Sequence, residues 1–550
     1  MNGVVAAVVR WPAAFLVANL ALVALAAALA AGAPDRLVVA GGVEAESGAD
    51  LIVIATPRAT TSAVVAGEAE VVIRNGLLAD PGVLEARPAA GTNKSGGSRI
   101  DVSLREGSAL GQRLAAERVA AAIDPGPLEV EVRGAALAQS RTRVQVEDEL
   151  GRLGLLALPL VLLVLGLAFG VRHVLAPVLA AATGSLGGIA VLRYLPDSLD
   201  LPVAGIAVAA VVGVAVGVEG SFALRRAFAD ASTADPRVRL ADCFSVAAPR
   251  LGWAFLLAAA AAAAMLALPL PAARSAALGG IAASFLAGIS ALLASASVLA
   301  ISPDVARGGR RFGHGRLGDR VRSGRLGEIG DEIAIRPGLS WIPALAGIAA
   351  LVWLALPVLD ADLVALTDDP SAAAPAERAT ELLGSRLRWV VALVTLAGMV
   401  AAYAAMRSGR RALAHGLTVA LPAVAACGLL VLAGEDRLPI GGSLPGEAPH
   451  ASTLLAVLAG VGAVSVARSA QASRAGALAG TLVAGGSFAS LAGAEVDAVA
   501  QLGVGMAAGL LFDLVFVAAI IAPSLDRALA AGLPSMPGVP RPRLPARLRR

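Results

Sequence analysis

The chain has 550 residues, of which 57% are hydrophobic and only 16% are charged, and its mean hydropathy is +0.76. Soluble domains are nearer half apolar and a quarter charged, so this composition excludes an ordinary soluble protein and indicates a membrane protein. The net charge of +4, from 45 basic and 41 acidic residues, is too small to indicate nucleic-acid binding.

A helix that crosses about 30 Å of hydrocarbon needs roughly 20 mostly apolar residues. Twelve stretches, numbered here as spans one to twelve, meet this requirement. They lie near residues 12–32, 153–171, 174–192, 201–222, 251–270, 277–301, 339–358, 389–406, 412–433, 452–467, 475–493 and 499–522. Span one has an alternative interpretation as a cleaved signal peptide, because Ala31-Gly32-Ala33 follows its apolar core. We favour a retained helix, since the apolar run is long and Trp11 stands where an interfacial anchor is expected.

Arginine placement predicts that both termini are cytoplasmic, because positive charge accumulates on that side of a membrane protein. A basic connector (303–338) and a basic tail (524–550) fall on the predicted cytoplasmic side, and Arg468 and Arg474 fall in another predicted cytoplasmic loop. Lys94 is the only lysine, and this bias, with the excess of Ala and Gly, is typical of a GC-rich bacterial genome. We therefore expect a multi-pass protein of the bacterial plasma membrane.

Residues 33–150 form the one long polar stretch on the predicted outer side, between span one (1–32) and spans two to six (151–302). Alternating and helical patterns predict strands and helices in the order βαββαβ. The predicted elements are strand 50–55, helix 61–78, strands 83–87 and 100–104, helix 109–123 and strand 128–132. This order is that of a ferredoxin-like split βαβ unit, so we expect one extracytoplasmic α+β domain.

The two halves of the chain repeat each other. Gly217-Val218-Glu219 in span four is followed by an Arg six residues after the Glu, and Gly460-Val461-Gly462 in span ten is followed by an Arg at the same spacing. The pattern predicts an all-α bundle of six plus six helices in parallel orientation, with the second half at 339–523. The outer loop of that half, 359–388, is too short for a second α+β domain.

With these features the chain resembles the RND superfamily, and in particular its MMPL branch of membrane transport proteins. The resemblance rests on the order and spacing of short motifs over essentially the whole chain. They are Asp80-Pro81-Gly82-Val83, Val130-Glu131-Val132-Arg133-Gly134, Gly217-Val218-Glu219-Gly220-Ser221-Phe222, Leu366-Thr367-Asp368-Asp369, and Gln501-Leu502-Gly503 through Asp513 to Pro523.

The resemblance implies a secondary transporter that exports a hydrophobic substrate, a lipid in the MMPL branch, at the expense of a proton gradient. Its partners would be membrane lipids and, because only one porter-like domain is present, a second copy of the chain or a partner subunit. Two departures favour the rival interpretation of a transport-incompetent lipid-sensing or scaffold protein. The second porter domain is missing, and the acid-Tyr pairs are incomplete, with Gly220 and Gly462-Ala463 at the relevant places.

Glu219 is the candidate proton-relay residue. It lies about 9 Å of helix rise from Arg225, a depth at which a carboxylate must be paired, protonated or hydrated. The family has an Asp at the matching position; the alternative is a side chain that reaches towards Arg225. Asp513 in span twelve is the second buried acid, and its alternative role is a hydrogen bond in helix packing.

A face of small residues in span four, spaced by four, predicts close helix packing that places this span in the bundle centre beside span ten. Its members are Gly205, Ala209, Gly213, Gly217 and Ser221. We find no nucleophile triad, P-loop, dinucleotide fingerprint or clustered His ligands, so we expect no enzymatic activity, no cofactor, no metal and no nucleic-acid partner.

Overall fold

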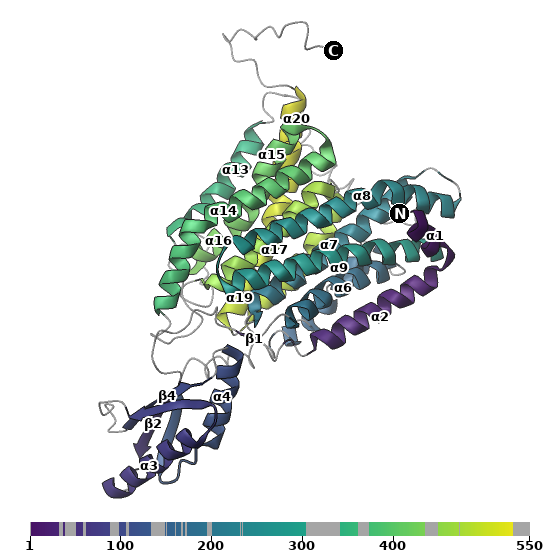
Figure 1. Cartoon of the computed structure of the whole chain (residues 1–550). Coiled ribbons are helices and arrows are strands. Elements are labelled where there is room, and N and C mark those ends of the chain that lie inside the picture. The colour runs from purple at the N-terminus through teal and green to yellow at the C-terminus, as the bar shows by residue number, and fades with distance from the viewer. Residues whose placement is uncertain are drawn as a thin grey trace, which may run out of the picture.

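The computed structural model consists of a bundle of long helices with a small α+β unit at one end (Figure 1). It describes residues 2–31, 33, 37–38, 51–58, 62–88, 98–105, 109–133, 149, 151–153, 155–159, 161–166, 169–170, 173–194, 201–231, 233, 235–303, 341–360, 373–434, 449–471, 474–494 and 496–531. The connector predicted at 303–338 lies outside this part of the chain apart from its first residue. Residues 39–50 and 134–148 of the predicted outer domain also lie outside it.

Eight helical segments in the described part are long and apolar enough to cross a membrane. Five belong to the first half: α2 (Pro12–Ala30), α6 (Leu175–Arg193), α7 (Val203–Asp230), α8 (Pro236–Ala263) with η3 (Ala264–Ala267), and α9 (Pro271–Ile301). Two are parts of longer helices: Arg386–Ala404 of α14 (Ala373–Met406) and Ala451–Ser469 of α17 (Ala451–Gln471). The last, Asp497–Asp526, runs through α19 (Asp497–Phe512), the π-helix η9 (Asp513–Ile521) and part of α20 (Ala522–Ala531).

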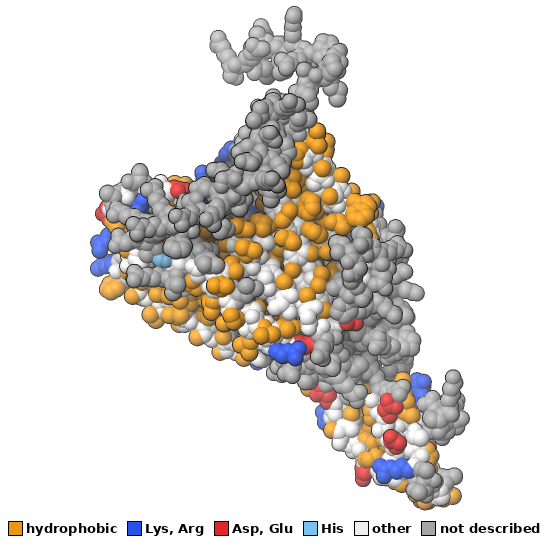
Figure 2. Space-filling model, turned by 180° about the vertical axis from the view of Figure 1, so that it is seen from behind, with side chains coloured by type: hydrophobic (Ala, Val, Ile, Leu, Met, Phe, Trp, Pro, Cys, Tyr) orange, Lys and Arg blue, Asp and Glu red, His pale blue; other side chains and the backbone are white. Residues whose placement is uncertain are grey.

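Four shorter apolar helices occupy the remaining predicted spans. They are Gly151–Gly166, Ile342–Val358 (α13, Trp341–Ala355, and η6, Leu356–Asp360), α16 (Leu421–Gly434) and Leu478–Gly493 (α18, Arg474–Ala489, and η8, Ser490–Gly493). An apolar helix therefore stands at each of the twelve predicted positions, and eight of them have the length of a membrane span. Hydrophobic side chains cover much of the bundle surface (Figure 2), as a surface in contact with lipid requires.

Three predicted boundaries differ from the structure. Helix α14 begins at Ala373, so the second half of the loop predicted at 359–388 is helical. Predicted span nine is divided into α15 (Gly409–Val419) and α16. The predicted tail from 524 begins inside α20, which continues to Ala531. In α14 and α20 polar helix formers extend the helix beyond the apolar segment, whereas the break before α16 lies next to Pro422, which lacks the backbone N–H of a continuous helix.

The same helix pairs pack in both halves of the bundle. In the first half (α2 to α9), α6 packs against α2, α7 and α9, and α9 packs against α7 and α8. In the second half (α13 to η9), α16 packs against α13, α17 and α19, and α19 packs against α17 and α18. Between the halves, α7 contacts α17 and α18, and α17 contacts α7 and α8. This matched set of contacts is what an internal repeat produces.

Helix α7 lies in the bundle centre, and its small residues let neighbouring backbones approach. A Cβ atom on Gly213 would lie 2.4 Å from the backbone nitrogen of Ser185, and one on Gly217 would lie 2.7 Å from that of Ala181, both on α6. A Cβ on Gly205 would collide with Ser275 of α9. The small face of α7 therefore packs against helices of its own half. The prediction related this face to span ten, which corresponds to α17. Helix α7 does contact α17, but through other residues.

Helix α2 packs against α6 and α9. The buried Asn19 accepts a hydrogen bond from the Ser290 hydroxyl of α9 at 3.0 Å, and Arg193 at the end of α6 donates to the Leu29 carbonyl at 2.7 Å. Polar contacts of this kind hold helices together within a bilayer. They give α2 a defined place in the bundle.

The α+β unit contains β2 (Leu51–Pro57), α3 (Ala63–Ala79), β3 (Val83–Pro88), β4 (Ser98–Leu104), α4 (Ala109–Ala122) and β5 (Leu128–Arg133). Each lies within two residues of a predicted element. The strand order is β3-β4-β2-β5, with all neighbours antiparallel. Alternate residues of β2 and β4 are buried and pack with apolar residues of the two helices in one core.

Asp80 joins three elements of this unit. Its carboxylate accepts a hydrogen bond from the Gly82 backbone at 2.7 Å, just before β3, and pairs with Arg118 of α4 at 3.1 Å. A Cβ on Gly82 would displace the Arg118 guanidinium from its place beside Asp80. Partial burial raises the pKa of Asp80, but the hydrogen bonds from Gly82 and Arg118 outweigh it and lower the pKa overall.

A short parallel pairing connects the linker of the α+β unit to the bundle. Strand β1 (Leu37–Val38), which follows α2, pairs with β6 (Leu201–Pro202), which leads directly into α7. The backbone that leaves the bundle for the α+β unit is thereby hydrogen-bonded to the start of the central helix.

We predict that Asp80→Asn weakens the junction of β3 and α4 by about 0.2–1 kcal/mol, the range for an exposed ion pair. Native-state hydrogen exchange of the full chain in detergent should show faster exchange in peptides from these two elements. The lowered pKa means that the ionised form favours folding. The stabilisation is therefore present above the ordinary carboxyl pKa and is lost as the pH falls through the lower folded-state value. Equal exchange in wild type and variant at neutral pH would contradict this role.

We predict that Gly217→Ala destabilises the bundle by about 1–3 kcal/mol, because the added methyl meets the α6 backbone, which cannot yield as a flexible side chain can. The matched control is Gly252→Ala on α8, where an added Cβ meets nothing within 4 Å. Thermal unfolding of the purified proteins should show a lower Tm for the first variant and an unchanged or higher one for the control. Equal Tm values would rule out the close packing.

Candidate functional site

Glu219 lies in the middle of α7 and is 2% exposed. Its Oε1 atom accepts hydrogen bonds from Nη2 and Nε of Arg468, at 2.7 and 3.2 Å. Arg468 belongs to α17 and is itself buried. The pair therefore joins the central helix of the first half to the central helix of the second half.

Asp513 and Thr481 complete the cluster. Nη1 of Arg468 donates to Asp513 Oδ2, and Nη2 also donates to the Thr481 hydroxyl at 2.9 Å. Asp513 is 2% exposed and stands where α19 gives way to the π-helix η9, while Thr481 is on α18. One guanidinium thus connects groups from four helices, and we call Glu219, Arg468, Thr481 and Asp513 the ion cluster.

Local sequence features bring these side chains together. Helices α17 and α7 are built from Ala, Val and Gly, and both are largely buried, so a charged residue on an inward face cannot reach water. A Cβ on Gly480 would lie 2.7 Å from Oε1 of Glu219, so glycine there makes room for the carboxylate. The π-helix after Asp513 is a rare form that often occurs at functional sites.

The charges of the cluster do not balance when all three groups are ionised. Two carboxylates and one guanidinium leave a formal charge of −1 in a buried site, where uncompensated charge is costly. Uptake of one proton by either carboxylate makes the cluster neutral. The arrangement can therefore bind and release a single proton, and the proton can be held by either half of the bundle.

The prediction placed Arg468 in a cytoplasmic loop and left span ten without a polar group near Glu219; both statements are wrong. Six residues separate Gly462 from Arg468, and the long guanidinium reaches back into the bundle. The sequence carried a signal for a cation near the acids, but not for which arginine supplies it. Two acids at hydrocarbon depth need a cation, and the repeat aligns Arg468 with Arg225. Asp513 was predicted as a separate buried acid and lies in the same cluster.

Arg225, the partner considered for Glu219, has different neighbours in the structure. Its guanidinium lies over the Phe169 ring at 5.7 Å, and it borders a cavity of about 10 Å³, roughly the space of one water. Ser221 and Ser295 are buried at this cavity with hydroxyls that have no hydrogen-bond partner among the described residues. Ser221, predicted as a packing residue, thus borders a small cavity.

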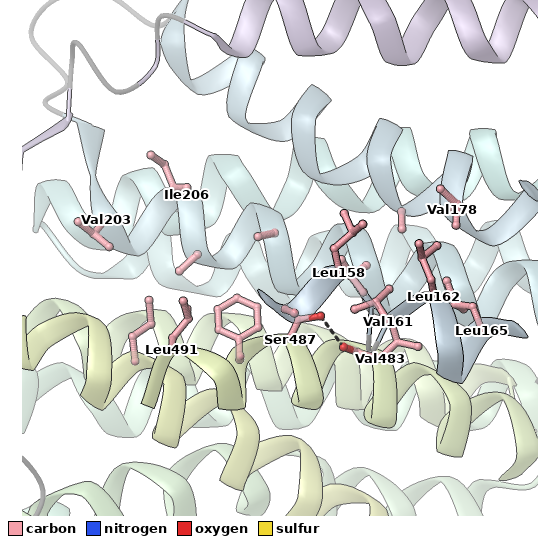
Figure 3. A pocket seen from close by; sticks show the side chains of 17 residues that line it. Leu158, Val161, Leu162, Leu165, Val178, Val203, Ile206, Val483, Ser487 and Leu491 are labelled. Atoms are coloured by element: carbon pink, nitrogen blue, oxygen red, sulfur yellow. Dashed lines mark hydrogen bonds between the residues drawn. The ribbon is translucent and has the colours of Figure 1, made fainter. Parts of the chain in front are cut away.

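A larger apolar groove of about 350 Å³ lies between the halves, bordered by α7 and α18 (Figure 3). Neither Glu219 nor Arg468 lines it. An apolar cluster of Leu165, Phe169, Val218, Ala479 and Val483 shares Leu165 and Val483 with the groove lining, and Val218 is next to Glu219 in the sequence. No group of three or more His, Cys, Asp or Glu side chains among the described residues could hold a metal ion.

No protein-family model and no curated protein matches the chain. Among solved structures, it is similar to SecDF in a super-membrane-facing form, with 13% identity over 94% of this chain and 91% of that chain and a TM-score of 0.46. It is also similar to SecDF, a translocon-associated membrane protein from Thermus thermophilus, with 13% identity over 88% and 85% of the two chains and a TM-score of 0.49. Similarity at this level assigns neither a family nor an activity.

We predict that Arg468→Met destabilises the bundle by about 3–5 kcal/mol, because it leaves two buried carboxylates without a cation. The triple variant Glu219→Gln, Arg468→Met, Asp513→Asn should recover most of this loss, since it removes the charges together. Arg226→Met is the control, because Arg226 pairs with Asp230 at an exposed position. Thermal unfolding in detergent measures all three. A triple variant no more stable than Arg468→Met would show that charge imbalance is not the cause.

Proposed function

We propose that the chain is a proton-coupled secondary transport protein of the RND type in a bacterial plasma membrane, and that it is not an enzyme. The observation that carries the proposal is the ion cluster. Two buried acids, one on each half of the bundle, share the guanidinium of Arg468, and this arrangement supports a proton-binding site between the halves. The matched helix contacts support the repeat, and the sequence motifs support the family.

The mechanism follows from the charge of the cluster. When Glu219 takes up a proton, its attraction for Arg468 weakens and the guanidinium is held mainly by Asp513 of the second half. When Asp513 carries the proton, the guanidinium is held mainly by Glu219 of the first half. Because Arg468 belongs to α17, proton transfer changes the force between α7 and α17, and movement of one half against the other is the expected response.

The α+β unit completes the proposed arrangement. Its element order βαββαβ supports the assignment as a ferredoxin-like split βαβ unit. We place it on the extracytoplasmic side and both termini in the cytoplasm, because the loops predicted to be cytoplasmic are the arginine-rich ones in the sequence. A single unit per chain would enclose a conduit only with a second copy or a partner subunit.

We further propose that the substrate is hydrophobic and, as in the MMPL branch, a lipid moved outward. The motifs quoted from the sequence support this assignment. The apolar groove between the halves is also compatible with it, since a lipid that leaves a bilayer needs an apolar surface along its path.

A transport-incompetent scaffold or lipid sensor is the second candidate, and the closed packing beside Glu219 favours it. The apolar cluster flanks the ion cluster, and the groove is not lined by either acid. In such a protein the ion cluster would stabilise the contact between the halves without moving a proton.

We predict that Glu219→Gln abolishes proton flux driven by a pH gradient in vesicles of phosphatidylethanolamine and phosphatidylglycerol, and that Asp513→Asn lowers it at least tenfold. A pH-sensitive dye inside the vesicles measures the flux. Asp230→Asn, at the exposed end of α7, is the control and should behave as wild type. Unchanged flux in Glu219→Gln would exclude the relay. No wild-type flux above that of empty vesicles would favour the scaffold.

A further inference from the structure

The α+β unit is held at both of its connections to the bundle, and the two connections end on different halves. The incoming chain is held by β1, which lies at the end of the bundle next to the unit (Figure 1) and pairs with β6 at the start of α7 in the first half. The outgoing chain is held by Glu149, whose two carboxylate oxygens accept from the Val496 backbone N–H at 3.2 and 3.3 Å. Val496 is the N-cap residue of α19 in the second half.

Glu149 is well suited to hold the start of α19. It is 7% exposed, and its partner lies 347 residues further along the chain. The N-cap residue of α19 is a valine, whose side chain cannot accept a hydrogen bond. Glu149 therefore supplies an acceptor at the end of the helix where backbone N–H groups lack intrahelical partners, and a carboxylate there is also favoured by the helix dipole.

The helix Gly151–Gly166, which follows this carboxylate, is fastened to the same half. The Ser490 hydroxyl of η8 donates a hydrogen bond to the Leu153 carbonyl at 3.4 Å. Near the other end of the helix, Leu165 packs in one apolar cluster with Val483 of α18. These contacts keep the outgoing connection of the α+β unit on the second half.

The two connections stand at the far ends of the helices that lead to the two acids of the ion cluster. Glu219 lies sixteen residues after Val203, the first residue of α7, and Asp513 lies sixteen residues after Asp497, the first residue of α19. Each acid is therefore about 24 Å of helix rise from the connection on its own helix. Because packed helices carry coupling between distant sites, the spacing of α7 and α19 links the ion cluster to the α+β unit.

We propose that Glu149 is a positioning residue that ties the α+β unit to the second half, while β1 ties the same unit to the first half. A single unit thereby follows the separation of the two halves, and a proton taken up by the ion cluster changes the distance between its two connections. The attachment through Glu149 does not depend on the proposed function; the response of the unit to proton uptake rests on it.

Hydrogen exchange of the full chain in detergent tests the attachment. Glu149→Ala should make the peptide that contains Val496 exchange about fivefold faster, as expected for the loss of a helix cap. Glu149→Gln keeps a side-chain oxygen as acceptor and should restore most of the protection. Glu129→Ala, at an exposed position of β5, is the matched control. Thermal unfolding checks that the variants fold, and equal exchange in wild type and folded Glu149→Ala would overturn the attachment.

The distance between two nitroxide labels tests the response of the unit. Labels on Leu84→Cys of β3 and Leu393→Cys of α14 are suitable, because both positions are exposed and the two native cysteines are buried. Glu219→Gln, which leaves the ion cluster with no net formal charge, should shift this distance by about 2 Å, the scale of helix shifts at interfaces. The shift should persist in Glu149→Gln and disappear in Glu149→Ala.

The outcomes separate this proposal from the proposed function when proton flux is measured on the same proteins. An equal shift with and without the Glu149 side chain, or no shift in a protein that carries protons, would overturn the positioning role alone. A shift that requires Glu149 in a protein without proton flux would overturn the proposed function alone. Absence of both the shift and the flux would overturn both.

Discussion

The structure depends on one guanidinium that is shared by two carboxylates inside a hydrophobic bundle. Arg468 contacts Glu219 of one half and Asp513 of the other, and all three are nearly inaccessible to solvent. Removal of one partner from such a set leaves charge that neither lipid nor alanine-rich helices can solvate. The cluster therefore constrains the distance between the halves, and its formal charge of −1 makes that constraint sensitive to the binding of one proton.

The small residues of α7 serve this arrangement. Gly213 and Gly217 allow the α6 backbone to approach closely, and Gly480 on α18 leaves space for the Glu219 carboxylate. The first half is thereby packed backbone against backbone, while the interface between the halves contains the ion cluster and the apolar groove.

The groove and the ion cluster occupy successive levels of the same interface. Apolar residues of α7 and α18 form part of the groove. Farther along the same helices, Glu219 of α7 and Thr481 of α18 belong to the ion cluster. Strand β6 connects the start of α7 to the linker of the α+β unit. A change in the spacing of α7 and α18 would thus act on the acids at one level and on the attachment of the α+β unit at the other.

The sequence by itself determined the positions of the apolar helices, the βαββαβ order of the α+β unit and the burial of Glu219 and Asp513. Hydropathy and alternation are local properties, and a helix in hydrocarbon satisfies its own backbone hydrogen bonds. Only the tertiary structure decided which cation meets these acids. Arg468 stands at the edge of its apolar run. At such an edge, the hydropathy of the sequence does not distinguish a side chain that points to water from one that points into the bundle. The choice depends on the carboxylates that α7 and α19 bring within reach, and no property of residues near Arg468 in the sequence reports their positions.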